Sequence, residues 1–194
     1  MVRIGVLALQ GAFLEHAKAL ARVGAEAVEV RLPQELDGID GLIIPGGEST
    51  TIGQIAGRWG LMDPIRDLAG SGRPIWGTCA GMILMATKIV DNSRAQPLLG
   101  LIDVAVRRNA FGRQVDSFEA ELSVPVLGDD PFHGVFIRAP LVESVGKKAE
   151  VLCQLDEGTT VAVRQGNLLA TAFHPELSND DRFHEFFVGL GGTK

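Results

Sequence analysis

The sequence predicts an α/β protein built around one mixed, mostly parallel sheet, with an antiparallel extension in its second half. In the first half, apolar runs of strand length alternate with segments of helical periodicity, the pattern of a parallel sheet with right-handed crossovers. In the second half, strand-like segments follow one another over short connections. The 194 residues are 46% hydrophobic and 22% charged, a composition that supplies one sizeable core and excludes intrinsic disorder. We therefore expect residues 1–194 to form a single domain.

The first strand and the first helix are marked by different apolar patterns. Residues 4–9 form a continuous apolar run, as expected of a strand buried on both faces. The apolar residues that follow fall on one helical face, namely Phe13, Leu14, Ala17, Leu20 and Ala21. Gly24 stands where a glycine commonly terminates a helix, so we expect this helix to end just before it.

Strands and helices continue to alternate through the rest of the first half. Short strands are expected at residues 27–30, Gly41–Ile44 and residues 74–76. Asp63 and Pro64 are typical of a helix N-cap and first helical position, and they predict a helix that continues through Leu68. A further helix is expected at residues 82–89.

The second half is predicted to be a series of strands closed by one helix. The strand-like segments are residues 102–106, 118–122, 134–137, 151–155, 160–164 and 168–173. The last two flank Gln165-Gly166-Asn167, which predicts a β-hairpin. Phenylalanines 183, 186 and 187 and Leu190 recur at helical spacing, and the polar residues 178–180 before them are candidate N-caps.

Charge and composition exclude several classes of partner. The chain has 18 basic and 24 acidic residues, and its longest basic runs are the pairs Arg107-Arg108 and Lys147-Lys148, so a nucleic-acid partner is not expected. The apolar stretches are too short for a membrane span or a signal sequence, and we therefore expect a cytoplasmic protein. Cys79 and Cys153 lie far apart, without the spacing of metal ligands.

The strongest chemical signal is Gly77-Thr78-Cys79-Ala80-Gly81, between an expected strand and an expected helix. This is the pattern of a nucleophile elbow with cysteine in the place of serine. The glycines are expected because side chains at their positions would clash with neighbouring backbone in such a tight turn. The following helix N-terminus favours thiolate over thiol. A buried, unreactive cysteine is the alternative, and the elbow context makes it the weaker one.

A cysteine nucleophile needs a base, and the base needs an orienting group. Among the four histidines His174 is the best candidate, because it ends an apolar strand and Glu176 follows two residues later. The other three are expected elsewhere. His16 is placed on the less apolar side of the first helix, His133 in a loop, and His184 facing solvent on the last helix.

Donors for a developing oxyanion are expected in Pro45-Gly46-Gly47-Glu48-Ser49-Thr50, the segment after one of the buried strands. Adjacent glycines allow backbone N–H groups to approach a substrate, and the N–H of Ala80 lies next to the nucleophile in sequence. The alternative is an anion-binding turn, since Gly-Gly-x-Ser before a helix also resembles a phosphate site. The common glycine patterns of nucleotide-binding proteins are missing from the sequence, which weakens that alternative.

Together, the elbow and His174-Pro175-Glu176 resemble the class I, triad-type glutamine amidotransferases. More narrowly, the chain is similar to the glutaminase subunits of pyridoxal 5′-phosphate synthase. This narrower resemblance rests on Leu9-Gln10-Gly11 with Glu15-His16, on residues 45–51, on Arg108-Asn109, and on residues 111–114, 116–119 and 136–140. It implies a three-layer, flavodoxin-like glutamine amidotransferase fold. The chain departs from the family pattern at Arg107 and Ala110, where the family often has Glu and Ser.

The resemblance implies hydrolysis of L-glutamine to glutamate and ammonia through a γ-glutamyl thioester on Cys79. His174 would be the base and acid, oriented by Glu176. Gly47 and Ala80 would form the oxyanion hole, assisted by Gln10. Substrate contacts are implied for Gly47, Glu48, Ser49, Arg108, Ile137 and Arg138. No cofactor and no metal are implied.

The charges of free glutamine agree with these contacts. Arg108 or Arg138 can pair with its α-carboxylate, and Glu48 can pair with its α-ammonium. Two plainer alternatives stay open from the residues alone. Arg138 can be an ordinary surface residue of a strand, and Glu48 a carboxylate in the first turn of a helix.

The resemblance also implies a partner, because the chain carries no second domain that could use ammonia. That partner is the lyase subunit of the synthase, a (β/α)8 barrel that forms a dodecameric ring. Three competing hypotheses stay open. The chain can be a glutamine amidotransferase subunit of another pathway, a related hydrolase or chaperone with a cysteine elbow, or a non-catalytic docking subunit.

Overall fold

The computed structural model describes residues 1–90, 95–108 and 117–191. Strands and helices alternate in the first half of the chain, as predicted. The strands there are β1 (Arg3–Leu7), β2 (Glu26–Val30), β3 (Gly41–Ile44), β4 (Ile75–Thr78) and β5 (Ala86–Ile89). The helices are α1 (Phe13–Arg22), α2 (Ser49–Arg58), α3 (Met62–Gly70) and α4 (Ala80–Met85), together with a short 3₁₀ helix, η1 (Pro33–Leu36).

The second half is mostly strands. These are β6 (Ile102–Arg107), β7 (Ser117–Leu122), β8 (Phe132–Ile137), β9 (Leu141–Val145), β10 (Glu150–Gln154), β11 (Thr160–Gln165) and β12 (Leu168–Thr171). Two 3₁₀ helices and the last α-helix complete it, namely η2 (Pro125–Leu127), η3 (Pro175–Leu177) and α5 (Arg182–Gly191).

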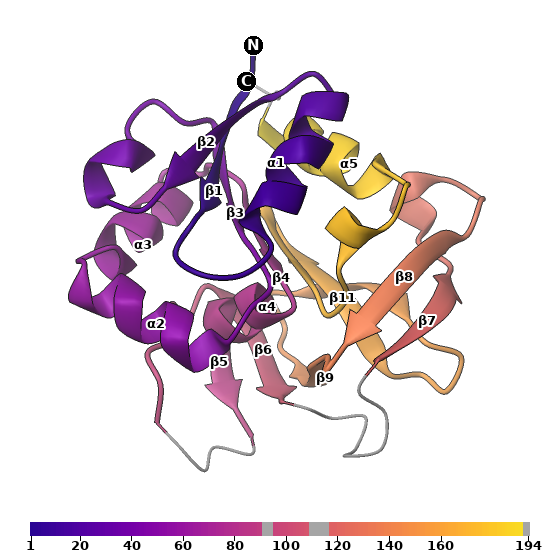
Figure 1. Ribbon diagram of the computed structural model, residues 1–194. Helices are drawn as coiled ribbons and strands as arrows, with labels where there is room; N and C mark the ends of the chain where they lie inside the picture. Colours follow the sequence, from indigo (N-terminus) through magenta and orange to yellow (C-terminus); the bar gives the residue numbers. More distant parts are fainter. Residues whose placement is uncertain (91–94, 109–116, 192–194) are drawn as a thin grey trace.

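One mixed sheet runs through the centre of the molecule (Figure 1). Within the described ranges its strand order is β2-β1-β3-β4-β12-β11-β9-β6-β5, and β10 pairs with β11. Strands β2, β1, β3, β4 and β12 are mutually parallel, β11 and β9 join by antiparallel pairing, and β5 is parallel to β6. Strands β7 and β8 form a separate antiparallel pair. The predicted mixed, mostly parallel sheet with an antiparallel extension is confirmed.

The parallel strands place the candidate site residues at one edge of the sheet. The register pairs Ile44 with Gly77 and Thr171 with Thr78, so β3, β4 and β12 end close together. Ligands of open α/β sheets bind beyond the carboxyl ends of such strands. The segments that follow these three strands carry Gly46-Gly47, Cys79 and His174, respectively.

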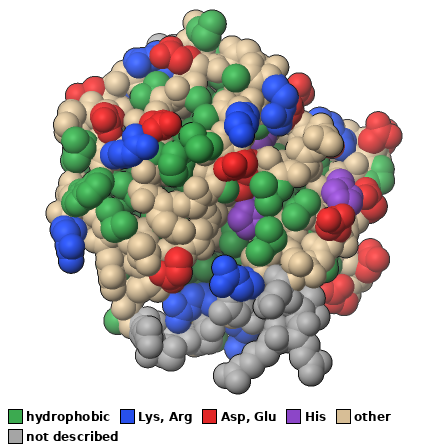
Figure 2. Space-filling view, in the orientation of Figure 1, with side chains coloured by type: hydrophobic (Ala, Val, Ile, Leu, Met, Phe, Trp, Pro, Cys, Tyr) green, Lys and Arg blue, Asp and Glu red, His purple; other side chains and the backbone are tan. Residues whose placement is uncertain are grey.

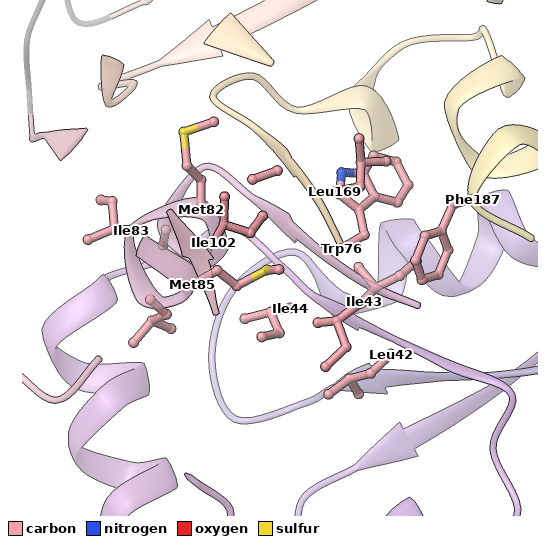
Figure 3. Packing of buried hydrophobic residues seen from close by; sticks show 14 of the residues in the cluster. Leu42, Ile43, Ile44, Trp76, Met82, Ile83, Met85, Ile102, Leu169 and Phe187 are labelled. Carbon is pink, nitrogen blue, oxygen red and sulfur yellow. The ribbon is translucent and has the colours of Figure 1, made fainter. Parts of the chain in front are cut away.

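Helices cover both faces of this sheet. Trp76 on β4 points to the face covered by α1 and α5, where its ring lies 5.7 Å from that of His16 and 5.6 Å from that of Phe187. In Figure 1, α1 and α5 lie together on one side of the sheet, and α2 and α3 lie on the other. Figure 3 shows Ile43 beside Phe187, and Ile44 beside Met85 of α4. In the described part of the chain, no helix has the length and apolar character needed to cross a membrane.

The predicted helix at 82–89 is wrong in its second half. Helix α4 begins at Ala80 and ends at Met85, and residues Ala86–Ile89 form β5 instead. The side chains of Thr87 and Ile89 are β-branched, which favours strand. In addition, β5 finds a parallel partner in β6, with Lys88 opposite Ala105. This pairing is distant in sequence and cannot be read from local periodicity.

Smaller corrections concern where elements begin. Helix α3 starts at Met62 with Leu61 as its N-cap, so Asp63 is not the cap and Pro64 is the third helical residue. The Asp63 carboxylate instead accepts a hydrogen bond of 2.6 Å from Arg66. Strand β1 ends at Leu7 rather than residue 9, and β9 was not predicted. The β11–β12 hairpin around Gly166 is confirmed.

Candidate active site

Cys79 lies at the sharp turn between β4 and α4. Its backbone has φ +49° and ψ −103°, a conformation that costs free energy in a residue with a side chain. A Cβ atom on Gly77 would collide with the carbonyl group of Gly81, and one on Gly81 would collide with that of Ile44. The Cys79 N–H donates to the Thr171 carbonyl at 2.8 Å and ties the turn to β12. The geometry is that of a nucleophile elbow, as predicted.

His174 and Glu176 come to the elbow from the segment after β12. The ring Nδ1 of His174 lies 2.7 Å from Oε1 of Glu176, and Pro175 begins the 3₁₀ helix η3 between them. The His174 N–H donates to the Val135 carbonyl of β8 at 2.8 Å, which holds the backbone in place. His174 and Glu176 are both buried. The structure therefore brings together the three residues predicted to form the triad.

The electrostatics of the site favour a protonated His174. Burial lowers the pKa of His174, but hydrogen bonds with Cys79 and Glu176 and the charge of Glu176 outweigh it and raise the pKa to about 10. Burial raises the pKa of Glu176, yet the nearby His16 and the hydrogen bond with His174 lower it overall. An imidazolium held between a sulfur and a carboxylate can deliver a proton to a leaving group.

The remaining histidines occupy other places than predicted. His184, expected to face solvent, is completely buried, because α5 packs its buried residues Phe183, His184 and Phe187 toward Trp76. His133, expected in a loop, lies in β8 and contacts the carboxylates of Glu119 and Glu121 at 2.9 and 2.7 Å. His16 lies in the first helix, α1, as predicted, but it is completely buried instead of lying on the less apolar side of that helix.

The glycine loop after β3 lies against the triad. A Cβ atom on Gly46 would collide with the His174 ring, and one on Gly47 would collide with the side-chain oxygen of Gln10. That oxygen accepts the N–H of Glu48 at 2.7 Å. Gly11 meets the same loop, since its φ is +104° and a side chain there would overlap the Gly46 carbonyl. Two of the predicted oxyanion-hole residues, Gly47 and Gln10, are thus neighbours.

Ala80, the other predicted donor, is the first residue of α4 and is buried directly beside Cys79. Backbone N–H groups in the first turn of a helix have no partner within the helix. They are therefore available to an oxyanion at the elbow.

Glu48 is the N-cap of α2. Its carboxylate accepts from the backbone N–H groups of Thr50 at 3.1 Å and Thr51 at 2.7 Å, and from the Thr51 hydroxyl at 2.7 Å. Burial raises the pKa of Glu48, and these hydrogen bonds lower it below its ordinary value overall. Glu48 thus caps the helix from the position just before its first turn, and this role leaves the carboxylate ionised and exposed at the N-terminus of α2, so that its predicted contact with substrate stays a prediction.

Ser49 and Arg108 are linked through a residue that the sequence did not single out. The side-chain oxygen of Gln96 lies 3.1 Å from the Ser49 hydroxyl and 3.2 Å from an Nη atom of Arg108. Gln96 belongs to no motif and to no regular element, so only the tertiary contacts reveal it. The departures from the family pattern lie at Arg107, which pairs with Glu143 at 2.8 Å, and at Ala110, outside the described residues.

Ile137, the last residue of β8, approaches the elbow, and Arg138 follows it in the sequence. The carbonyl oxygen of Ile137 lies 3.9 Å from the Cys79 sulfur. Arg138 has φ +44°, which is uncommon for a residue with a side chain, and it is exposed. Figure 2 shows a histidine near the centre of one face, with acidic side chains above it and basic side chains below it. Such a distribution suits a small ligand with both charges.

A thiol, an imidazole and a carboxylate that contact one another in this order, beside a turn of backbone amides, define a cysteine hydrolase of the triad type. Residues 6–190 match the model of the SNO glutamine amidotransferase family. The chain belongs to this family, and the resemblance predicted from the sequence is confirmed.

Several relatives are similar over their full length. The pyridoxal 5′-phosphate synthase subunit PdxT of Herpetosiphon aurantiacus is 60% identical, over 96% of this chain and 99% of its own. The subunit of the same name from Moorella thermoacetica is 56% identical, over 98% of this chain and 100% of its own. A crystal structure of a glutamine amidotransferase superposes with a TM-score of 0.92 at 51% identity, covering 98% of this chain and 99% of that chain. The structure of PurLQS from Thermotoga maritima, at 19% identity and a TM-score of 0.70, shares the fold.

Proposed function

We propose that this chain is the glutaminase subunit of a pyridoxal 5′-phosphate synthase, which hydrolyses L-glutamine and passes the ammonia to a synthase subunit. The observation that carries the proposal is the series of contacts from Cys79 through His174 to Glu176 at the elbow. Membership in a glutamine amidotransferase family supports glutamine as the substrate. The printed names of full-length relatives support the pathway.

The first half of the reaction forms a thioester. The Cys79 sulfur attacks the side-chain amide carbon of glutamine, and His174 holds the proton that the thiol has lost. A C–S bond forms and the amide oxygen becomes an oxyanion. When this intermediate collapses, the C–N bond breaks and His174 gives its proton to the nitrogen, which leaves as ammonia. The product is a γ-glutamyl thioester on Cys79.

The second half hydrolyses the thioester. His174, now neutral, accepts a proton from a water molecule, and the water oxygen attacks the thioester carbon. The C–S bond breaks, the new γ-carboxyl group releases its remaining proton to solvent and leaves as glutamate, and the protonated His174 again lies beside the sulfur. Glu176 stays ionised throughout, because its lowered pKa keeps it a carboxylate that orients the His174 ring and stabilises the imidazolium.

The oxyanion would be bound by the N–H groups of Gly47 and Ala80. Each such donor typically lowers the barrier by about 3–4 kcal/mol. Gln10 assists by holding the loop, since its side-chain oxygen takes the N–H of Glu48 and fixes the backbone next to Gly47. Docking of the synthase subunit is expected to complete this arrangement.

Glutamine would be held by its charged α-substituents. Glu48 is the carboxylate for the α-ammonium, and Arg108 or Arg138 is the cation for the α-carboxylate. The Ser49–Gln96–Arg108 contacts support a shared role for Ser49 and Arg108 on one side of the substrate. Ile137 would form the opposite side, next to the sulfur.

The synthase partner is proposed to be a (β/α)8-barrel lyase subunit in a dodecameric ring, to which copies of this chain bind. Ammonia then travels to the barrel without release into bulk water. We place the reaction in the cytoplasm, where a reducing environment would keep the proposed nucleophile Cys79 as a free thiol.

The experiment that tests this function compares two cysteine variants in a glutamate-release assay with and without the synthase subunit. Cys79→Ser is expected to lower kcat by at least ~10³-fold, since the nucleophile of a triad carries most of the chemistry. Cys153→Ser is the matched control, because Cys153 is buried in β10 and burial raises its pKa to about 11, which keeps it an unreactive thiol. Glutamate release by Cys79→Ser at the parent rate would contradict the proposal.

The same assay separates the competing functions. A glutamine amidotransferase of another pathway would release glutamate but would gain nothing from the synthase subunit and would not support pyridoxal 5′-phosphate formation. A docking subunit without activity would leave Cys79 unlabelled by an electrophilic glutamine analogue, even with the synthase present.

A further inference from the structure

Two completely buried histidines lie behind the triad, and the reaction as described does not use them. His16 comes from α1 and His184 from α5, so they are far apart in sequence. Nδ1 of His16 lies 3.0 Å from Nε2 of His184. On its other side, Nε2 of His16 lies 3.3 Å from Oε2 of Glu176 and 3.2 Å from the Thr78 hydroxyl. The contacts of the triad therefore continue from Glu176 into the core.

Nε2 of His16 is the nitrogen that approaches the second oxygen of Glu176. Oε1 of Glu176 is taken by His174 at 2.7 Å, whereas Oε2 is buried and has no hydrogen-bond partner among the described residues. Leaving a buried carboxylate oxygen without a donor costs free energy. Nε2 of His16 forms its hydrogen bond with the Thr78 hydroxyl, and a proton on this nitrogen would also lie next to Oε2, 3.3 Å away.

The contacts of the two rings select one pair of tautomers. Among the described residues, Nδ1 of His184 has no hydrogen-bond partner, so the ring is best satisfied with its proton on Nε2 and a bare Nδ1. Nε2–H of His184 then donates to Nδ1 of His16, which places the proton of His16 on Nε2. That N–H is hydrogen-bonded to the Thr78 hydroxyl, and Oε2 of Glu176 lies 3.3 Å from the same nitrogen. One direction of donation thus runs from α5 through α1 to the edge of the triad.

The surroundings keep both rings neutral and in place. Burial is the main cause that lowers the pKa of each, to about 3 for His184. The charged or titratable groups that act on His16 are Glu176, His174 and Glu15, and those that act on His184 are His16, Glu176, Asp181 and Arg22. Trp76 contacts both rings edge-on, at 5.7 Å from His16 and 5.0 Å from His184.

We infer that His16 and His184 are positioning residues of the glutaminase: in series, they place the N–H of His16 beside the unpartnered Oε2 of Glu176, where its partial positive charge helps to hold Oε1 toward His174. This inference rests on the proposed function. Without the His16 N–H, the Glu176 carboxylate is free to rotate about χ3, and its affinity for a proton increases. Either change weakens its control of the His174 tautomer.

The central test compares two amides at position 16 in the full chain with the synthase subunit. In His16→Gln the side-chain NH₂ reaches the position of Nε2 and retains an N–H beside Oε2 of Glu176. In His16→Asn it reaches only the position of Nδ1. We expect Gln to keep kcat within about threefold of the parent, and Asn to lose about 10–100-fold, the range typical of outer hydrogen-bond partners. KM should change less than about twofold in both, because neither residue touches glutamine.

A pH profile separates positioning from general damage. Loss of the donor raises the proton affinity of the Glu176–His174 pair, so the acid limb of kcat/KM is expected at higher pH in His16→Asn and unmoved in His16→Gln. Equal kcat for the two amides, or an acid limb that stays in place in both, would overturn the inference. Circular dichroism and thermal midpoints establish that both variants are folded at the assay temperature.

Position 184 gives an independent test, which also serves if substitution at position 16 prevents folding. His184→Gln retains a donor for His16 and His184→Leu does not, so only the leucine variant should lose kcat. In a double-mutant cycle, adding His184→Leu to His16→Asn should cause no further loss of kcat, because His184 acts through His16. Additive losses would contradict a serial arrangement. Cys79→Ser is assayed in parallel: if it is active the proposed function fails, and if it is inactive while all histidine variants equal the parent, only this inference fails.

Discussion

At the scale of single residues, the site depends on how buried charges are paired. Glu176 has no exposed side-chain surface, and it stays ionised because His174 and His16 face its two oxygens. His174 in turn holds a proton because Cys79 and Glu176 lie on either side of it. Each group is therefore in its working protonation state only while its neighbour is present. Substitutions in this series should affect chemistry more than binding.

Glu176→Gln tests the orienting carboxylate. The amide retains the shape of Glu176 but removes the negative charge that stabilises the His174 imidazolium, and it can leave the ring in the wrong tautomer. We expect kcat to fall by ~10²–10⁴-fold, by analogy with the triad aspartate of serine proteases, with little change in KM. Glu157→Gln, at an exposed turn, is the control and should equal the parent in steady-state assays. An active Glu176→Gln variant would exclude the triad assignment.

Acid stability should report on His184. Because its pKa in the folded protein is about 3, below the ordinary 6.5, the unfolded chain takes up a proton between these values that the folded chain refuses. The parent should therefore lose up to about 1.4 kcal/mol of unfolding free energy per pH unit from this group as the pH falls below 6.5. Urea denaturation at several pH values should show a shallower loss in His184→Gln. If the unfolding free energies of the parent and of His184→Gln fall in parallel with pH, protonation of His184 does not contribute to the loss of stability in acid.

At the scale of elements, the strand-to-helix turn depends on the absence of side chains. Helix α4 passes so close to β3 and β4 that a Cβ atom on Gly81 would overlap the Ile44 carbonyl. The close approach places the N-terminus of α4, and therefore the Ala80 N–H, at the nucleophile. The sequence has 24 glycines in 194 residues, more than the roughly 7% usual for proteins, and this excess is partly explained by backbone segments that must lie close to each other.

Gly81→Ala is expected to destabilise the fold by about 2 kcal/mol or more, because rigid backbone has to move to admit the methyl group. Gly57→Ala is the matched control. Gly57 lies in α2, where a Cβ atom would meet nothing within 4 Å, so the change should stabilise by about 0.5–1 kcal/mol through helix propensity. Chemical denaturation measures both. A tolerated alanine at position 81 would contradict the steric account of the elbow.

At the scale of the whole molecule, the first and last helices meet over the middle of the sheet. Trp76 stands at this junction, with Phe183 at 6.0 Å and Phe187 at 5.6 Å between ring centroids, and it contacts both buried histidines. On the surface, Arg22 of α1 and Asp181 just before α5 join the same two helices at 2.6 Å. His16 of α1 lies in this junction and 3.3 Å from Glu176, so the candidate triad carboxylate lies next to the packing of the first and last helices.

Trp76→Ala should cost about 3–5 kcal/mol of unfolding free energy, the usual result of removing a large aromatic side chain from a core. Trp59→Ala is the control, because Trp59 is 44% exposed at the end of α2 and its loss should cost less than about 1 kcal/mol. Guanidinium titrations of both variants provide the comparison. Similar losses for the two tryptophans would argue against the central role of Trp76.

The sequence by itself determined the alternating elements of the first half, the β11–β12 hairpin, the elbow around Cys79 and the pairing of His174 with Glu176. These signals are local, because a turn, a helical face or a short motif is written in neighbouring residues. Only the tertiary structure decided that residues 86–89 form a strand beside β6, that Gln96 joins Ser49 to Arg108, and that His16 and His184 are buried behind Glu176. Each of these depends on contacts between distant segments, which local patterns cannot encode.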